Sequence, residues 1–162
     1  MNANATVAAK VYVSGPLTSI DISTAHRLKQ LYVAIGDLCW KSGYEAYVPH
    51  TNGTDPIANP QTSPSQVFRI DKEKVQSSDL LIAYVNIPSL GVGMELAYAE
   101  SCSIPIILLY ERGARISRFV LGIPSIVAIV EFADFDDALR QIENQLVSLR
   151  PLPKRSLPAR MS

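Results

Sequence analysis

The stretch "DLLIAYVNIPSLGVGMELAYAE", residues 79–100, leads from one apolar segment through two glycines into a second apolar segment. Its first part is continuously apolar, as expected of a strand in the centre of a parallel sheet. The residues from Met94 to Ser103 are predicted to form a helix. A strand followed by a glycine-containing loop and a helix is half of a βαβ unit, so this stretch indicates an α/β protein.

The same alternation continues along the chain in both directions. We expect strands at "AKVYVSG", "YEAYVP", "DLLIAYVN", "IPIILLYE" and "SIVAIVEF". Helices are expected over 21–42, where Gly43 is the stop signal, over 65–78, over 94–103 and in "DFDDALRQIENQLVSL". Five strands alternating with helices predict a flavodoxin-like, doubly wound five-stranded parallel sheet of order 2-1-3-4-5 with flanking helices.

Composition limits the classes of protein that fit. The chain has 162 residues, of which 48% are hydrophobic, so we expect one domain over residues 1–149. Residues 150–162 are rich in proline and arginine and contain no acid; we expect a disordered tail, with a partner-binding or subunit-bridging role as the alternative. The preceding body is mildly acidic, which argues against nucleic acid as a partner.

Membrane and metal sites are not expected either. No apolar run approaches the ~20 residues of a membrane-spanning helix, and "MNANATVAAK" lacks the apolar segment of a secretory signal. We therefore expect a cytoplasmic protein without a membrane partner. Cys39 and Cys102 lie in apolar helical stretches, which favours buried, reduced thiols, and with two histidines no metal site is expected.

The predicted topology places a ligand at one edge of the sheet. In doubly wound sheets ligands bind beyond the carboxyl ends of the strands, at the switch point between the first and third strands. The loops that meet there are "SGPLTS" and "NIPSLGVG", and their glycines allow close approach of the backbone. The loop "HTNGTDPIANPQTSP", residues 50–64, is the long irregular segment, and long loops in compact domains are often functional.

Glu95 is a lone carboxylate among small and apolar residues, and three explanations compete for it. An acid in the first turn of a helix is stabilised by the helix dipole by about 0.3–1 kcal/mol. A dinucleotide fingerprint would use Gly91 and Gly93, with Glu111 at the next strand end, although Leu96 replaces the third glycine. Alternatively, Glu95 is a nucleophile held at the crevice, and such a role requires a second carboxylate.

Asp71 is the candidate for that second carboxylate. It is the acid on the helical face that also carries Val67, Phe68 and Val75. Neighbouring charged residues favour a solvated surface position as the alternative. From spacing alone, both interpretations stay open.

A resemblance changes this weighing. The string "PSLGVGMELAYA", an aspartate 24 residues before its glutamate and the opening strand "VYVSG" resemble the nucleoside 2-deoxyribosyltransferase superfamily, and within it the 2'-deoxynucleoside 5'-monophosphate N-glycosidases. The likeness extends roughly from Lys10 to Leu146 and is specific in the segment from Pro88 to Ala99. It implies hydrolysis of an N-glycosidic bond without a metal or organic cofactor.

The resemblance also implies roles for the matching positions. Glu95 resembles the nucleophile that attacks C1' of the sugar and forms a glycosyl-enzyme, in the two-step manner of retaining glycosidases. Asp71 resembles the second carboxylate, which assists departure of the base. Tyr12 and Gly15 match first-strand positions that line the sugar and phosphate side of the pocket.

Further matches concern the phosphate. Ser89 matches the serine that holds the 5'-phosphate, which would also meet backbone N–H groups near Gly91 and Gly93 at a helix start. Ser117 resembles a serine supplied by the neighbouring subunit, which implies a homodimer with shared sites. Thr18 stands where the N-glycosidases have a phosphate-binding arginine, and Arg115 or Arg118 is a possible substitute.

Several residues carry weaker expectations. His50 ends the second strand and could face the nucleobase, with a structural or solvated role as the alternative. Other base contacts are expected from the loop between His50 and Pro64. Tyr98 and Trp40 are expected to be packing residues because of their helical positions.

The function that follows is hydrolysis of 2'-deoxynucleoside 5'-monophosphates to free base and 2-deoxyribose 5-phosphate. One alternative is deoxyribosyl transfer, or hydrolysis, acting on unphosphorylated deoxynucleosides. Ser89 favours the monophosphate, because the deoxyribosyltransferases resemble one another in having an aspartate there, which would repel a phosphate. A nucleotide-binding module without turnover is a further alternative, since a fold alone does not determine function.

Overall fold

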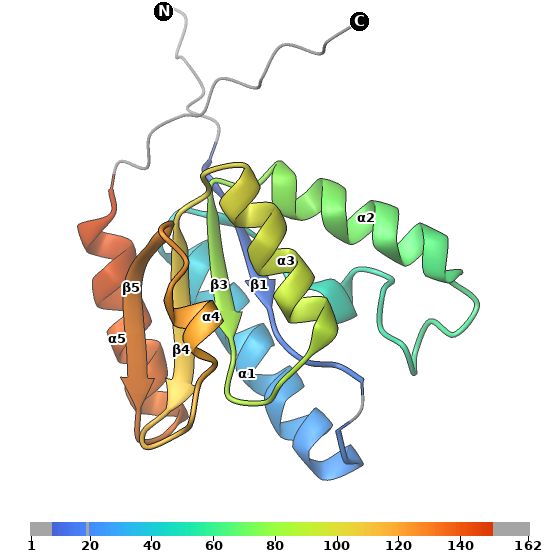
Figure 1. The fold of residues 1–162 in the computed structure, drawn as a ribbon, viewed down its shortest axis with the longest axis horizontal. Helices are drawn as coiled ribbons and strands as arrows, with labels where there is room; N and C mark the ends of the chain where they lie inside the picture. The colour runs from blue at the N-terminus through green and yellow to red at the C-terminus, as the bar shows by residue number, and fades with distance from the viewer. Residues whose placement is uncertain (1–7, 19, 151–162) are drawn as a thin grey trace, which may run out of the picture.

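The computed structural model describes residues 8–18 and 20–150. Their five strands form one parallel sheet of order β2-β1-β3-β4-β5 (Figure 1). The strands are β1 (Lys10–Ser14), β2 (Glu45–Tyr47), β3 (Leu80–Tyr84), β4 (Ile106–Glu111) and β5 (Ile126–Phe132). This topology confirms the predicted flavodoxin-like sheet.

Helices cover both faces of the sheet (Figure 1). They are α1 (Ile22–Lys41), α2 (Pro64–Gln76), α3 (Leu90–Ser101), α4 (Arg118–Leu121) and α5 (Phe135–Ser148), and the 3₁₀ turn η1 (Pro49–Thr51) follows β2. Apolar side chains of α1 and α5 form one core against the sheet, and those of α2 and α3 form the other. Every residue of β3 is buried because this strand is covered on both faces.

Helix α3 begins four residues earlier than its sequence predicts. Ser89 is the N-cap, and its hydroxyl accepts a hydrogen bond from the Val92 N–H at 3.5 Å. This cap, together with burial of Val92, Leu96 and Ala99 in the core, offsets the cost of two helical glycines, which is about 1 kcal/mol for each. Glu95 therefore lies in the second turn, and the first turn contains no acid. The first-turn explanation of Glu95 is wrong.

The early start of α3 also excludes the dinucleotide-fingerprint explanation. Gly91 and Gly93 lie inside α3 rather than in a phosphate-binding loop, and the Gly93 N–H donates to the Ser89 carbonyl at 3.0 Å. Glu111 is engaged elsewhere, because its carboxylate accepts a hydrogen bond from the Tyr84 hydroxyl at 3.2 Å. With Gly91 and Gly93 exposed in the first turns of α3 and Glu111 bonded to Tyr84, Glu95 is left to be explained by its surroundings.

Other expectations differ in detail from the structure. The four-residue helix α4 was not predicted, and Val127 and Ile129 on the edge strand β5 are exposed. Trp40 is 58% exposed, so it is not a packing residue. Cys39 is buried, whereas Cys102 caps the end of α3 and is partly exposed; both are free thiols.

The predicted tail falls almost entirely on residues 151–162, which lie outside the described residues. Its first residue, Arg150, places its guanidinium 5.3 Å from the ring centroid of Tyr44. That contact makes Arg150 the last described part of the folded body.

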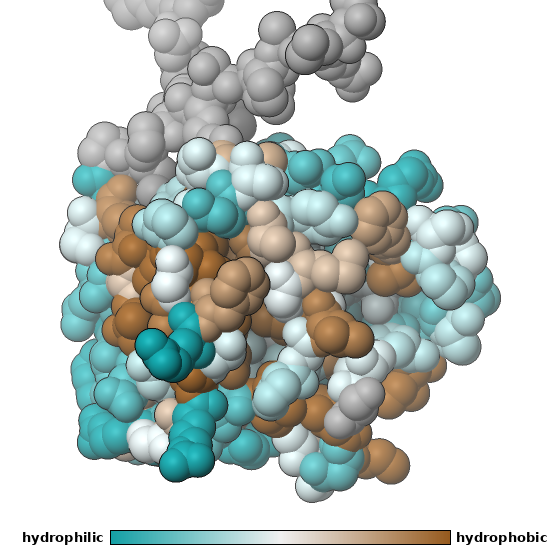
Figure 2. Space-filling model, in the orientation of Figure 1, coloured by the Kyte–Doolittle hydropathy of each residue, from teal (hydrophilic) through white to brown (hydrophobic). Residues whose placement is uncertain are grey.

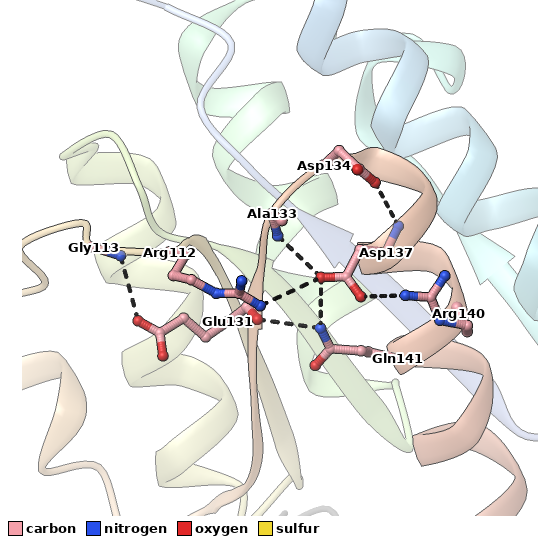
Figure 3. A network of polar contacts seen from close by, with 8 residues as sticks. All are labelled: Arg112, Gly113, Glu131, Ala133, Asp134, Asp137, Arg140 and Gln141. Atoms are coloured by element: carbon pink, nitrogen blue, oxygen red, sulfur yellow. Dashed lines mark hydrogen bonds and ion pairs between the residues drawn. The ribbon is translucent and has the colours of Figure 1, made fainter.

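A polar network fixes the turn between β5 and α5 (Figure 3). Asp134 caps α5 by accepting from the Asp137 N–H at 2.8 Å. The Asp137 carboxylate in turn accepts from the Ala133 N–H at 3.0 Å and from the Arg140 guanidinium at 2.7 Å. Reciprocal bonds of this kind satisfy N–H groups that the first turn of a helix leaves unpaired.

Candidate active site

A cavity of about 530 Å³ lies beyond the carboxyl ends of β1 and β3, as the topology predicts. The loop after β2 and the facing sides of α2 and α3 complete its wall. Its lining residues are Gly15, Leu17, Thr18, Thr54, Asp55, Pro56, Asn59, Pro60, Thr62, Pro64, Val67, Phe68, Asp71, Lys72, Ser89, Gly91, Val92, Met94, Glu95 and Tyr98. Of the predicted site residues, it brings together Glu95, Asp71, Gly15, Thr18, Ser89 and Gly91.

The carboxylate of Glu95 is held by two hydroxyls from β1. The Tyr12 hydroxyl donates to Oε1 at 2.7 Å, and the Ser14 hydroxyl donates to Oε2. Tyr12 and Ser14 point to the same side of the sheet because side chains alternate along a strand. Sequence reasoning missed Ser14, although this two-residue period in "VYVSG" was the signal that could have found it.

Burial raises the pKa of Glu95 to about 7, and the nearby charge of Asp71 adds to the shift. The hydrogen bonds from Ser14 and Tyr12 oppose the shift because they stabilise the ionised form. Near neutral pH, Glu95 can therefore exist as a poorly hydrated carboxylate with two fixed donors. Such a group is a suitable nucleophile for an electron-poor carbon.

Asp71 supplies a second carboxyl group from α2. Its Oδ1 atom is buried and has no hydrogen-bond partner among the described residues. Burial raises the pKa of Asp71 to about 6, and the nearby Thr54 hydroxyl offsets part of that rise. Two carboxyl groups whose pKa values lie near neutrality can divide the roles of acid and nucleophile between them.

Tyr12 lies behind the carboxylate rather than on the cavity wall, because its side chain is fully buried in the core under α3. The prediction that it lines the pocket is corrected accordingly. Burial and the charge of Glu95 raise the pKa of Tyr12 well above its ordinary value, so it stays a protonated donor. The Tyr47 ring stacks on it, with 5.5 Å between centroids.

The expected phosphate side contains Gly15, Thr18, Ser89 and Gly91. A Cβ atom on Gly15 would lie 2.2 Å from the Tyr32 ring, so a larger residue cannot occupy this position without moving that ring. Ser89 and Gly91 stand at the start of α3, where N–H groups lack intrahelical partners. Backbone rather than charged side chains dominates this end.

Besides Tyr12, three predicted site residues lie outside the cavity. Gly93 lines a neighbouring apolar hollow of about 320 Å³, together with the exposed residue Ser117; this hollow shares Ser89 and Val92 with the cavity. His50 is turned toward Tyr32, with 6.2 Å between ring centroids. Burial and the charge of Lys29 lower the pKa of His50, which favours a neutral, structural histidine.

Sequence reasoning also missed an aromatic wall on α2 and α3. Phe68 and Tyr98 meet edge to face with 6.3 Å between centroids. The Lys72 ammonium lies 4.9 Å from the Tyr98 centroid and 5.4 Å from that of Phe68. Tyr98 therefore packs, as expected, but also lines the cavity. Phe68 and Lys72 stand four residues apart on α2, a spacing visible in the sequence.

The loop wall is anchored by an ion pair. The Lys29 ammonium on α1 contacts the Asp55 carboxylate, and these side chains are 23% and 4% exposed. The Asp55 carboxylate also accepts from the N–H groups of Ile57 and Ala58 at 2.8 and 3.0 Å. The "TDP" sequence was a usable signal, since aspartate commonly bonds the backbone of a turn in this way.

Within residues 8–18 and 20–150, no group of three or more histidine, cysteine or acidic side chains could hold a metal ion. None of the helices in this part of the chain combines the length and apolar character needed to cross a membrane.

Comparison with known proteins agrees with this geometry. A protein of Thermofilum pendens, provisionally named 2'-deoxynucleoside 5'-phosphate N-hydrolase 1, is 30% identical over 140 residues, which cover 85% of this chain and 94% of that protein. The chain belongs to the 2'-deoxynucleoside 5'-phosphate N-hydrolase family. No family model matches the chain.

Solved structures share the fold of this N-hydrolase family member. The CMP N-glycosidase of Clostridium botulinum superposes with a TM-score of 0.64 at 17% identity, covering 84% of this chain and 98% of that one. The 2-deoxyribosyltransferase of Bacillus psychrosaccharolyticus superposes with a TM-score of 0.60 at 22% identity, covering 84% and 91%. At these identities the likeness establishes the fold alone.

Proposed function

We propose that the protein hydrolyses the N-glycosidic bond of 2'-deoxynucleoside 5'-monophosphates, releasing the free base and 2-deoxyribose 5-phosphate. The observation that carries the proposal is Glu95, bonded by Tyr12 and Ser14 on the wall of a cavity that also contains Asp71. Membership in an N-hydrolase family supports the reaction class.

The reaction proceeds in two displacements. In the first, the ionised Glu95 forms a bond to C1' while the C1'–N bond breaks and the base takes a proton from Asp71. In the second, Asp71 accepts a proton from water, whose oxygen attacks C1' and releases Glu95. Each step leaves the pair with one carboxylate and one acid or ester, so no further reactant is needed.

Ser89 and the start of α3 are proposed to hold the 5'-phosphate. The Ser89 hydroxyl and Gly91 line the cavity, and the positive end of the helix dipole favours an anion there. Replacing Ser89 by aspartate should weaken binding of a monophosphate more than binding of the matching nucleoside. Equal weakening of both ligands would remove this assignment.

One observation favours a second candidate, a reaction on unphosphorylated deoxynucleosides. Among the described lining residues, Lys72 is the single basic side chain, and Thr18 offers a hydroxyl without charge. A neutral hydrogen bond to phosphate is roughly half as strong as a charge-assisted one. Transfer of deoxyribose to a second base belongs to the same candidate.

A substrate panel separates these candidates. Each deoxynucleoside and its 5'-monophosphate is incubated with the protein, with and without an acceptor base, and free base and new nucleoside are measured by chromatography. Base release from monophosphates without acceptor is the expected result. Product that requires an acceptor would support transfer, and binding without turnover would support a nucleotide-binding module.

We also propose that the active unit is a homodimer. Phe119 and Leu90 are 91% and 92% exposed, and apolar residues gather over α4 and β5 (Figure 2). Ser117 precedes α4 on this surface and could reach a second copy's phosphate if the surface were covered. Sedimentation equilibrium should give twice the chain mass for the native protein, and half that value for Phe119→Asp. A native monomer with full activity would contradict the proposal.

A further inference from the structure

Three buried polar groups beside the cavity lack a complete set of hydrogen bonds. The Asp71 Oδ1 atom and the Tyr47 hydroxyl have no partner among the described residues. Thr54, which is 6% exposed, donates its hydroxyl proton to the Pro49 carbonyl at 3.0 Å, and no described residue donates to its oxygen. Buried polar groups are almost always hydrogen-bonded, so these vacant positions require an explanation.

The three groups lie within reach of one another. Thr54 and Asp71 line the same cavity. The Thr54 hydroxyl lowers the pKa of Asp71 and also that of Tyr47, which places it close to both side chains, although in this conformation it donates to the Pro49 carbonyl and bonds neither of them. A hydroxyl carries one proton and two lone pairs and rotates freely, so it can serve either neighbour.

We propose that Thr54 is a positioning residue for Asp71, whose hydroxyl turns from the Pro49 carbonyl to the Asp71 carboxylate when Asp71 gives up its proton. In the same arrangement the Tyr47 hydroxyl donates to the Thr54 oxygen. All three side chains are then satisfied. The Pro49 carbonyl keeps a partner, because it also accepts from the Asn52 N–H at 2.9 Å.

The other groups around Asp71 do not stabilise its ionised form in the way that a Thr54 donor would. The groups that face Asp71 are Tyr12 on β1, Tyr47 on β2, Glu95 on α3, and the cavity-lining residues Asp55 and Lys72. The Tyr12 proton is already donated to Glu95. A like charge on Glu95 opposes ionisation of Asp71, whereas a hydroxyl donor favours it. The catalytic consequence rests on the proposed function; the hydrogen-bond switch does not.

The switch is tested directly by the carboxyl carbon-13 resonance of Asp71. The titration is measured in a Glu95→Gln background, where Asp71 titrates without its coupled partner. Thr54→Val should raise the pKa of Asp71, because it removes the donor to the ionised form, and Thr54→Ser should restore the original pKa. An unchanged pKa in Thr54→Val, or an equal rise in Thr54→Ser, would overturn the proposal.

Two further variants protect this test. Tyr47→Phe leaves the loop intact and should raise the pKa of Asp71 by less than Thr54→Val does. If Thr54→Val does not fold, Tyr47→Phe replaces it as the test. An unchanged pKa of Asp71 in Tyr47→Phe would then refute the switch. Thr51→Val removes a hydroxyl that donates to the Val48 carbonyl at 2.9 Å outside the cavity, and should leave the pKa of Asp71 unchanged.

Turnover supplies a second readout. With Glu95 intact, Thr54→Val should lower kcat about tenfold with little change in KM, because a donor to the developing Asp71 charge is lost. Thr54→Ser should recover most of kcat. If the native protein cleaves no deoxynucleotide, the proposed function fails while the titration still decides the switch.

Discussion

Two clusters of acidic side chains in this molecule follow opposite physical rules. At the turn between β5 and α5, Asp137 accepts from backbone and side-chain donors, which hold its pKa below the ordinary value (Figure 3). In the cavity, burial raises the pKa of Glu95 to about 7 and that of Asp71 to about 6. The first cluster stabilises a fold, whereas the second keeps acids ready to exchange protons near neutral pH.

The largest effect is expected from Glu95→Gln. Turnover should be lost, because the neutral amide cannot form the glycosyl-enzyme. The free energy of unfolding of Glu95→Gln, by contrast, should exceed that of the native protein at high pH. The pKa of Glu95 in the folded protein, about 7, exceeds its ordinary 4.5. The neutral acid therefore contributes fully below about pH 4.5, and up to about 3 kcal/mol of stability is lost as pH rises through 7.

Urea denaturation at pH 5 and pH 8 checks this stability claim. The free energy of unfolding of Glu95→Gln, relative to that of the native protein, should be larger at pH 8 than at pH 5. Glu100→Gln, on the same helix but bonded to the Ser125 N–H, is the matched control and should retain turnover. A Glu95→Gln protein that still releases base, or that unfolds more readily at pH 8, would erase the distinction between the two clusters.

A smaller loss is expected from Asp71→Asn, which removes the acid that protonates the base. General acid catalysis typically contributes 10²–10⁴-fold, so we expect kcat to fall by about 10³-fold. Deoxynucleotides with a better leaving group should be affected less. Glu73→Gln, an exposed neighbour on α2, serves as the control. Equal loss with good and poor leaving groups would contradict the role of Asp71.

The pH dependence of kcat/KM should be a narrow bell. Below about pH 6 both carboxyl groups bind protons and Glu95 cannot attack; above about pH 7 both are ionised and no acid remains. The two apparent pKa values of this profile describe the coupled pair of Glu95 and Asp71 rather than either residue alone. Steady-state kinetics between pH 4.5 and 9 would reveal them, and a flat profile across this range would contradict the shared proton.

Ser14→Ala should have a moderate effect. Loss of this donor raises the pKa of Glu95, so the shared proton remains on Glu95 more often and the alkaline limb moves to higher pH. We expect kcat/KM at pH 7 to fall about tenfold, the value of one hydrogen bond to a charged group. Ser101→Ala, which removes an exposed hydroxyl bonded to the Tyr98 carbonyl, should leave the profile unchanged.

The smallest catalytic effect is expected at the other cluster. Asp137→Asn should leave kcat unchanged and lower the thermal midpoint slightly. Because the pKa of Asp137 is depressed, its contribution is present above the ordinary aspartate pKa and disappears as pH falls through the folded value. Calorimetry at pH 7 and pH 3 should show the difference between variant and native protein shrinking in acid. A constant difference would mean that charge is not involved.

The sequence predicted the sheet because each strand is an apolar run bounded by turn residues, and it predicted Glu95 and Asp71 through a resemblance. It placed the start of α3 too late because Gly91 and Gly93 are poor helix formers, and the Ser89 cap is visible only once the helix is known. It missed Ser14, which acts through a contact 81 residues away.

Long-range contacts explain the remaining differences. The position of Thr54 follows from loop residues 50–64, whose conformation depends on the ion pair between Asp55 and Lys29 of α1 as well as on the local turn that Asp55 forms. His50 was expected at the nucleobase, but it lies in the 3₁₀ turn η1 and faces Tyr32. Strand and helix periods carry no information about such loop geometry.

The central claim is that Glu95 bonds covalently to the sugar. Acid quenching during turnover of a deoxynucleoside 5'-monophosphate, followed by mass spectrometry of the protein and its peptides, tests it most directly. We predict an increase equal to deoxyribose 5-phosphate less one water, located on the peptide that contains Glu95 and absent in Glu95→Gln. Rapid release of base in a single turnover with no adduct, or an adduct on another residue, would contradict the account.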